Sequence, residues 1–150
     1  MKKLFNTPSI RKIILLLVVA SAAVLLVNCK GKDPQPSEQD VVKTKLASSP
    51  WTLQSVTVDG VDQTAVYQGL TITFTATTYT TTKGGIVWPA SGTWSFTDDT
   101  ATAIKREDGT EVKVEATDTS LKLTLTWAKT TLGTGRVESV KGLHVFTFKK

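Results

Sequence analysis

Cysteine and histidine are almost absent from this chain of 150 residues, which has one of each, Cys29 and His144. A single cysteine excludes an intrachain disulfide and any CxxC metal or redox motif. With one cysteine and one histidine, a transition-metal site is also not expected. The folded chain must therefore gain its stability mainly from burying apolar side chains.

Acidic residues are missing from the first 28 positions, which hold four of the 18 basic residues and none of the 13 acidic ones. The remaining chain has 14 basic against 13 acidic residues, so its net charge is +1 rather than the +5 of the whole sequence. No cluster of Lys and Arg interleaved with aromatic residues remains, and a nucleic-acid partner is therefore not expected.

The N-terminal apolar run is too short for a membrane span. It covers 15 uncharged residues, 13–27, whereas a span needs about 20. Basic residues precede the run and Cys29 follows it. This arrangement is typical of a secretory signal peptide, so we expect residues 1–28 to be removed on export. A single-pass anchor with an uncleaved helix is the alternative.

Residues 30–45 lack an apolar period of either helical or strand type. They carry Pro34, Pro36 and charges of both signs. We therefore expect residues 29–45 to form a flexible tether with an r.m.s. span of roughly 20–25 Å. The remaining residues, 46–150, are enough for one domain with one core.

From residue 47 onward, threonine, β-branched and aromatic residues dominate, and apolar and polar residues alternate. Leu121, Leu123 and Leu125, for example, alternate with Lys122 and Thr124. A period of two is typical of antiparallel strands with one buried face. No segment has a helical period apart from a turn near 61–67. Eight strands are predicted, over residues 51–58, 69–76, 78–82, 91–97, 102–106, 110–116, 120–128 and 142–149.

The connections between these strands are short. The turns at 107–109 and 117–119 have the length of hairpin turns, and the first contains Asp108-Gly109, which supports a positive φ. In the first strand the parity of the apolar positions changes near Gln54 and Ser55, which predicts a bulge. This pattern favours an all-β fold, an eight-stranded antiparallel up-and-down barrel, over a Greek-key sandwich.

The alternation also predicts which side chains fill the barrel. Most are bulky, so we expect a largely filled interior with at most a shallow pocket at the open end. The residues expected to face inward are Trp51, Leu53, Leu70, Ile72, Phe74, Tyr79, Trp94, Phe96, Ile104, Val112, Val114, Leu121, Leu123, Leu125, Trp127, Phe146 and Phe148.

Several short motifs resemble a known family. Leu46 and the segment Ser49-Pro50-Trp51-Thr52-Leu53 are similar to the first-strand tryptophan segment of lipocalins. Three further segments resemble strands of the small lipocalin-like lipoproteins of Bacteroidota, namely Ser91-Gly92-Thr93-Trp94-Ser95-Phe96-Thr97-Asp98-Asp99, Thr119-Ser120-Leu121-Lys122-Leu123-Thr124, and Gly142 with Phe146-Thr147-Phe148-Lys149-Lys150. The resemblance implies an eight-stranded calycin-type barrel, mostly without an assigned activity. It also implies that a late basic residue, here Arg136, packs over Trp51.

The end of the N-terminal segment, Leu26-Val27-Asn28-Cys29, resembles a bacterial lipoprotein lipobox, with Asn28 in place of the usual Gly, Ala or Ser. The resemblance implies that Cys29 becomes the first residue of the mature protein and carries fatty acyl chains such as palmitate. Several acyl chains make a durable anchor. The expected location is therefore the cell envelope, lipid-anchored to the outer membrane on its periplasmic or cell-surface side.

No residue pattern indicates catalysis. His144 lies on the last predicted strand, and a structural role is favoured over a general base. No serine lies in a GxSxG-type turn. Asp98, Asp99 and Asp118 fit turns better than a calcium site. We therefore expect no enzymatic activity, no bound metal and no cofactor.

Residues 83–90 stand out because two glycines precede Ile86, Val87, Trp88 and a proline. Such a segment is either a mobile lid over the barrel mouth or a plug that seals one end of the barrel, and the plug is slightly favoured.

Two functions remain open. The first is a non-catalytic module that binds a small apolar or amphipathic ligand at the barrel mouth through Tyr79, Ile86, Val87, Trp88 and Trp94. The alternative is a structural or protein-interaction lipoprotein of the cell envelope with a filled barrel, no ligand and a protein partner that the sequence does not identify.

Overall fold

The computed structural model describes residues 35–129 and 141–150. Within these ranges, no helix has the length and apolar character needed to cross a membrane. The elements are, in chain order, α2 (Glu38–Ala47), β1 (Trp51–Val58), β2 (Val61–Asp62), the 3₁₀ turn η1 (Thr64–Tyr67), β3 (Thr71–Phe74), β4 (Thr78–Thr82), β5 (Ser91–Phe96), β6 (Ala103–Arg106), β7 (Glu111–Ala116), β8 (Ser120–Trp127) and β9 (Gly142–Lys149).

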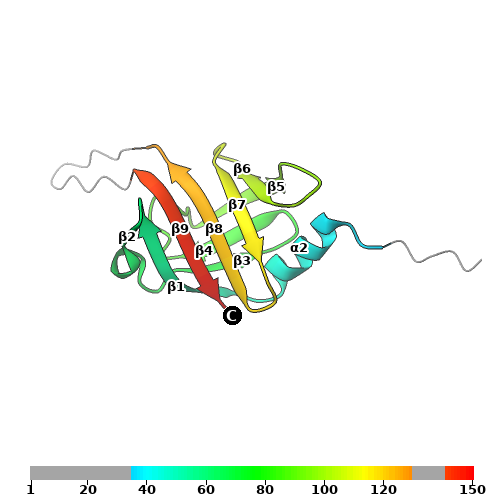
Figure 1. Cartoon of the computed structure of the whole chain (residues 1–150), viewed down its shortest axis with the longest axis horizontal. Helices are drawn as coiled ribbons and strands as arrows, with labels where there is room; N and C mark the ends of the chain where they lie inside the picture. Colours follow the sequence, from blue (N-terminus) through cyan, green and yellow to red (C-terminus); the bar gives the residue numbers. More distant parts are fainter. Residues whose placement is uncertain (1–34, 130–140) are drawn as a thin grey trace, which may run out of the picture. The chain divides into compact units, whose positions relative to one another are not determined.

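Eight of these strands form a closed antiparallel barrel (Figure 1). The neighbours follow the order β1-β3-β4-β5-β6-β7-β8-β9, and pairing of β1 with β9 closes the ring. The two-residue strand β2 pairs with the end of β1 and was not predicted. The predicted all-β, eight-stranded up-and-down barrel is thus confirmed, with strand boundaries within two residues of those expected.

The predicted irregularity in β1 is also present. The register between β1 and β9 shifts between Leu53 and Ser55. The extra residue bends the strand and resets its alternation, so that Val56 is completely buried. The turn expected near 61–67 is the 3₁₀ turn η1.

Helix α2 corrects the prediction of a flexible tether, which is wrong from Glu38 onward. A capping box starts the helix: the Asp40 backbone N–H donates to Ser37 Oγ at 3.1 Å, and the Asp40 carboxylate accepts from the Ser37 backbone N–H. Leu46 is the buried residue of this helix, and Val42 packs partly against the core. Two apolar contacts in ten residues are too few to produce a visible helical period. Residues 1–34 lie outside the described residues.

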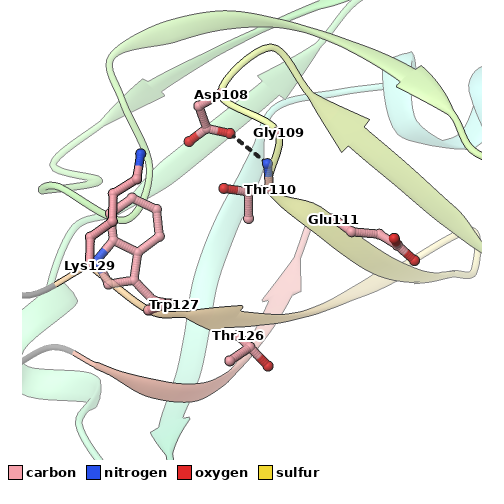
Figure 2. A pocket seen from close by; sticks show the side chains of 8 residues that line it. Asp108, Gly109, Thr110, Glu111, Thr126, Trp127 and Lys129 are labelled. Atoms are coloured by element: carbon pink, nitrogen blue, oxygen red, sulfur yellow. Dashed lines mark hydrogen bonds between the residues drawn. The ribbon is translucent and has the colours of Figure 1, made fainter.

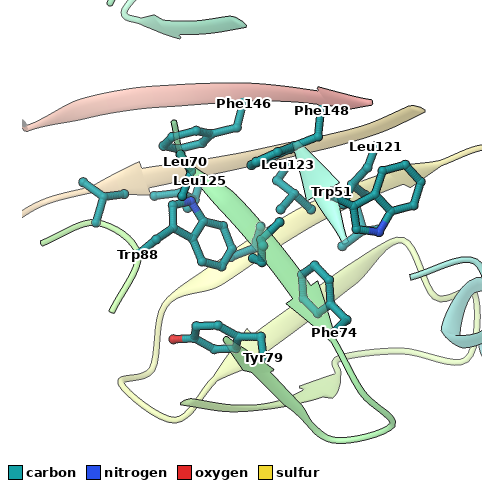
Figure 3. Packing of buried hydrophobic residues seen from close by; sticks show 14 of the residues in the cluster. Trp51, Leu70, Phe74, Tyr79, Trp88, Leu121, Leu123, Leu125, Phe146 and Phe148 are labelled. Atoms are coloured by element: carbon teal, nitrogen blue, oxygen red, sulfur yellow. The ribbon is translucent and has the colours of Figure 1, made fainter. Parts of the chain in front are cut away.

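The barrel interior is filled by large side chains (Figure 3). All residues predicted to face inward are buried except Leu53 and Phe96, which are partly buried against the core. Figure 3 shows Trp88 and Trp51 toward opposite ends of a row of leucines and phenylalanines from β8 and β9. The core also takes in buried residues beyond the predicted set, namely Leu46, Val56, Tyr67, Val87 and Trp88.

The up-and-down topology divides the connections between two ends of the barrel. The helix end contains α2 and the short turns at 75–77, 97–102 and 117–119. The loop end contains the longer connections at 59–70 and 83–90, the turn at 107–110, and the ends of the connection from β8 to β9.

Candidate functional site

The segment 83–90 turns back into the loop end of the barrel. The Trp88 backbone N–H donates to the Gly84 carbonyl oxygen at 3.1 Å. A Cβ at Gly84 would lie 2.2 Å from the Trp88 carbonyl oxygen, so this tight turn requires glycine. Val87 and Trp88 are completely buried, whereas Ile86 is 43% exposed. The segment is therefore a plug in this structure, and we use that name for residues 83–90.

Trp88 is enclosed on several sides. Its ring lies nearly perpendicular to the rings of Tyr79 and Phe146, with centroid separations of 5.6 and 6.1 Å. The guanidinium carbon of Arg106 lies 4.9 Å from the centroid of the Trp88 ring. The indole Nε1 of Trp88 is buried without a hydrogen-bond partner among the described residues. A ligand therefore has no direct access to Trp88 in this conformation.

Arg106 connects the plug to the turn between β6 and β7. Its side chain is fully buried. Nη1 donates to the Val87 carbonyl oxygen at 2.7 Å, and Nε donates to Oδ1 of Asp108 at 3.3 Å, while Nη2 pairs with the second carboxylate oxygen. Because an unpaired buried charge is strongly unfavourable, this pair holds the plug and the turn together.

Asp108 stays ionised over the physiological range. Partial burial opposes its charged form, but hydrogen bonds from Arg106 and Thr110 outweigh this effect and hold its pKa at about 2. From the sequence, Asp108 is expected to be a turn residue, and no role is predicted for Arg106. The inward position of Arg106 could have been predicted, because it lies two residues after the inward-facing Ile104 on the same strand and therefore on the same face.

A hollow of about 410 Å³ lies beside this ion pair at the loop end (Figure 2). It forms where β7 and β8 separate. Their pairing ends at Lys113 and Thr124, so the first residues of β7, from Glu111, do not pair with β8. The last residues of β8, up to Trp127, pair with β9 alone. The residues that line it are Asp108, Gly109, Thr110, Glu111, Thr126, Trp127, Ala128 and Lys129.

Trp127 is the aromatic side chain of this hollow. It is 5% exposed, and its Nε1 has no hydrogen-bond partner among the described residues. Lys129 lies over it, with Nζ 5.3 Å from the centroid of the Trp127 ring. Asp108 and Thr110 add a carboxylate and a hydroxyl on the side of Trp127, while the exposed side chains of Glu111 and Thr126 line the rim and point away from the ring (Figure 2). The hollow thus combines a mostly buried aromatic ring, covered by Lys129, with hydrogen-bond donors and acceptors.

His144 lies in the core near the loop end. Its Nε2 is 3.1 Å from the Tyr67 hydroxyl, and its Nδ1 is 3.1 Å from the Gly142 carbonyl oxygen. Since a carbonyl only accepts, Nδ1 carries a proton, and in the neutral ring Nε2 then accepts from the Tyr67 hydroxyl. Burial lowers the pKa of His144. These contacts agree with the structural role expected for this residue.

The aspartates considered as calcium ligands form no such site. The carboxylate of Asp98 accepts hydrogen bonds from the hydroxyls of Thr100 and Thr102, at 2.6 and 3.3 Å, within its own turn. Over residues 35–129 and 141–150, no group of three or more His, Cys, Asp or Glu side chains is arranged to hold a metal ion.

The structure brings together four of the five residues predicted to bind a ligand. Tyr79, Val87, Trp88 and Trp94 are all buried inside the barrel, and Ile86 lies at the surface. A ligand at this site would first have to displace the plug, and the site remains a prediction. The hollow beside Trp127 was not predicted, because strand pairing and the fold of the plug decide where the barrel wall opens.

Two other predicted residues, Cys29 and Arg136, lie outside the described residues. The side chain nearest to the role implied for Arg136 is Lys150, whose Nζ lies 5.3 Å from the centroid of the Trp51 ring.

Comparison with models of known protein families, with curated proteins and with solved structures finds no match.

Proposed function

We propose that this protein is exported, anchored in the outer membrane through acyl chains on Cys29, and acts as a non-catalytic binding protein. Its ligand is a small amphipathic molecule that binds at the loop end. One observation carries this proposal: the hollow lies at the loop end, whereas the helix end is closed by α2. The signal-like segment over residues 1–28 and the lipobox-like sequence before Cys29 support export and anchoring.

The attachment of α2 supports the choice of the loop end. Gln39 Nε2 donates to the Asp98 carbonyl oxygen at 2.9 Å, and the Trp51 indole N–H donates to the Leu46 carbonyl oxygen at 2.9 Å. The chain that comes from Cys29 therefore joins the barrel at the helix end. The loop end is the one opposite this junction, and it is free to meet a ligand.

A titration tests ligand binding. The mature-length chain, residues 29–150 with Cys29→Ser, is titrated with the amphipathic probe 1-anilinonaphthalene-8-sulfonate while tryptophan emission is followed. We expect a saturable change, because Trp127 and Trp88 lie at the loop end. The variant Trp88→Ala tests whether the barrel interior also binds the probe. If removal of the Trp88 side chain opens space beneath the plug, we expect a larger change in emission. A titration without any saturable signal in either protein would contradict the proposal.

A second candidate function is supported by the exposed apolar residues. In the described part of the chain, the large apolar residues that are exposed, Val61, Val66, Ile86 and Leu143, all belong to the loop end. Apolar residues exposed at one end of a molecule favour a protein partner. Crosslinking and pull-down from intact cells should then recover a stable partner. The double variant Ile86→Ser with Leu143→Ser should no longer recover this partner. If the native protein is recovered without any partner, this candidate function is contradicted.

Anchoring has its own test. Replacing the only cysteine with Cys29→Ala should abolish labelling by a fatty-acid probe and release the protein from the membrane fraction. A Ser37→Ala variant, changed in the following segment, is the matched control and should remain labelled. Persistent labelling of the Cys29→Ala protein would contradict attachment at this residue.

A further inference from the structure

The gap between β7 and β8 leaves backbone groups available inside the hollow. Beyond Lys113 and Thr124 the two strands no longer pair, while β8 remains paired with β9 on its other side up to Trp127 and Gly142. Among the described residues, peptide groups on the separated edges have no strand partner across the gap, and such groups can bond to water or to a ligand. A molecule with several hydrogen-bonding groups could replace this water.

The charges around the hollow cancel. Asp108 is paired with Arg106, and Glu111 and Lys129 contribute one charge of each sign. The ring of Trp127 also lies close to two cations, with Arg106 Cζ at 5.9 Å and Lys129 Nζ at 5.3 Å from its centroid. A cationic ligand would meet both of these positive charges, and an anionic ligand would meet two carboxylates. The hollow therefore favours a neutral ligand.

Trp127 adds a requirement for an apolar face. Its indole N–H is a buried donor without a partner among the described residues, and such a group gains when a ligand supplies an acceptor. The ring is covered by the long side chain of Lys129 (Figure 2). Because a cation–π contact at an exposed site is weak, a ligand with an apolar face can displace this ammonium group.

We propose that the hollow beside Trp127 binds a neutral carbohydrate unit. A sugar ring combines an apolar C–H face with hydroxyls that both donate and accept, which matches a tryptophan flanked by carboxylates, threonine hydroxyls and free peptide groups. A hollow of about 410 Å³ also has the size of a small-molecule site. This inference rests on the proposed function, since it names the chemical class of its ligand.

The test uses the full-length lipoprotein in a polyoxyethylene detergent, which has no sugar headgroup to compete. Methyl glycosides of glucose, galactose, mannose and N-acetylglucosamine are titrated separately, and binding is followed by saturation-transfer NMR and tryptophan emission. Acetate and tetramethylammonium are the charged comparison probes. We expect at least one glycoside to saturate the protein, with no saturable binding of either ion. Preferential binding of an ion would overturn the inference.

Two variants at exposed positions locate the site without disturbing the core. Glu111→Gln and Thr126→Val each remove one polar group of the hollow, and each should weaken glycoside binding about tenfold. Glu115→Gln and Thr124→Val, on the same two strands but outside the hollow, are the matched controls and should bind as the native protein does. Equal affinity in all four variants places the glycoside elsewhere and overturns the inference.

Together with the naphthalene-probe titration of residues 29–150, the glycoside titration separates this inference from the proposed function. If no glycoside saturates the protein while the naphthalene probe does, the carbohydrate assignment is wrong and the binding function stands. If neither saturates, both are wrong.

Discussion

The two ends of the barrel are closed in chemically different ways. At the helix end, Trp51 is buried under α2, and its indole N–H is bonded to the Leu46 carbonyl oxygen. At the loop end, Trp88 of the plug is buried in the barrel, but its indole N–H has no partner among the described residues, and a charged Arg106 lies against it. Unsatisfied donors and buried charges lower stability and often mark functional sites. The helix end is therefore expected to contribute more to stability, and the loop end is where we propose that a ligand binds.

The largest expected effect compares the two buried tryptophans directly. Trp51→Ala should lower the free energy of unfolding by about 3–5 kcal/mol, because it leaves a cavity and removes a satisfied hydrogen bond. Trp88→Ala should cost less, since it also removes a donor whose burial without a partner costs roughly 1–3 kcal/mol. Urea denaturation of the mature-length chain measures both values. An equal or larger loss for Trp88→Ala would remove the distinction between the ends.

The next effect concerns the ion pair of the loop end. Asp108→Asn leaves Arg106 buried without a counter-charge and should lower the free energy of unfolding by about 3 kcal/mol. The double variant Arg106→Met with Asp108→Asn should recover much of this loss, because it also removes the stranded charge. Urea denaturation of the two proteins gives the comparison. A double variant that is less stable than Asp108→Asn would show that Arg106 stabilises the plug without needing its carboxylate.

The sequence predicted the barrel well because strand patterns are local. The alternation of Leu121, Leu123 and Leu125 with polar residues predicts which face of β8 is buried, and these three leucines are buried in the structure. The parity change near Ser55 likewise located the bulge in β1. Both inferences need only the period of a strand and the polarity of neighbouring residues.

The helix and the candidate site could not be predicted in the same way. The capping box of Ser37 and Asp40 is visible in the sequence, but α2 has too few apolar residues to show a helical period. The hollow depends on where β7 separates from β8 and on the approach of Lys129 to Trp127. These are tertiary contacts, and no local pattern determines them.

A smaller effect tests how the helix end is held. Ser37→Ala removes the N-cap of α2 and should lower the stability of this helix by about 1 kcal/mol. Hydrogen exchange measured residue by residue should show faster exchange in α2 and unchanged rates at the loop end. Thr44→Ala, an exposed change within the same helix, is the control and should leave exchange nearly unaltered. Faster exchange throughout the barrel would instead make α2 part of the global folding unit.

The smallest effect is a pH dependence that belongs to the loop end alone, because His144 is the only histidine of the chain. Burial lowers the pKa of His144 below its ordinary value of 6.5, against the opposing influence of the nearby Asp59 carboxylate. The unfolded chain therefore binds a proton at a higher pH than the folded chain does. The stability associated with neutral His144 is fully present above the unfolded pKa and is lost as the pH falls below it.

Urea midpoints between about pH 5 and pH 7 should therefore rise with pH. In His144→Gln this slope should disappear, while Asp59→Asn should make it steeper because the favourable charge near the ring is lost. Glu115→Gln removes an exposed carboxylate whose pKa lies below this pH range, and it should leave the slope unchanged. A slope that survives in His144→Gln would mean that another group titrates on folding, and the pH dependence would no longer distinguish the loop end from the helix end.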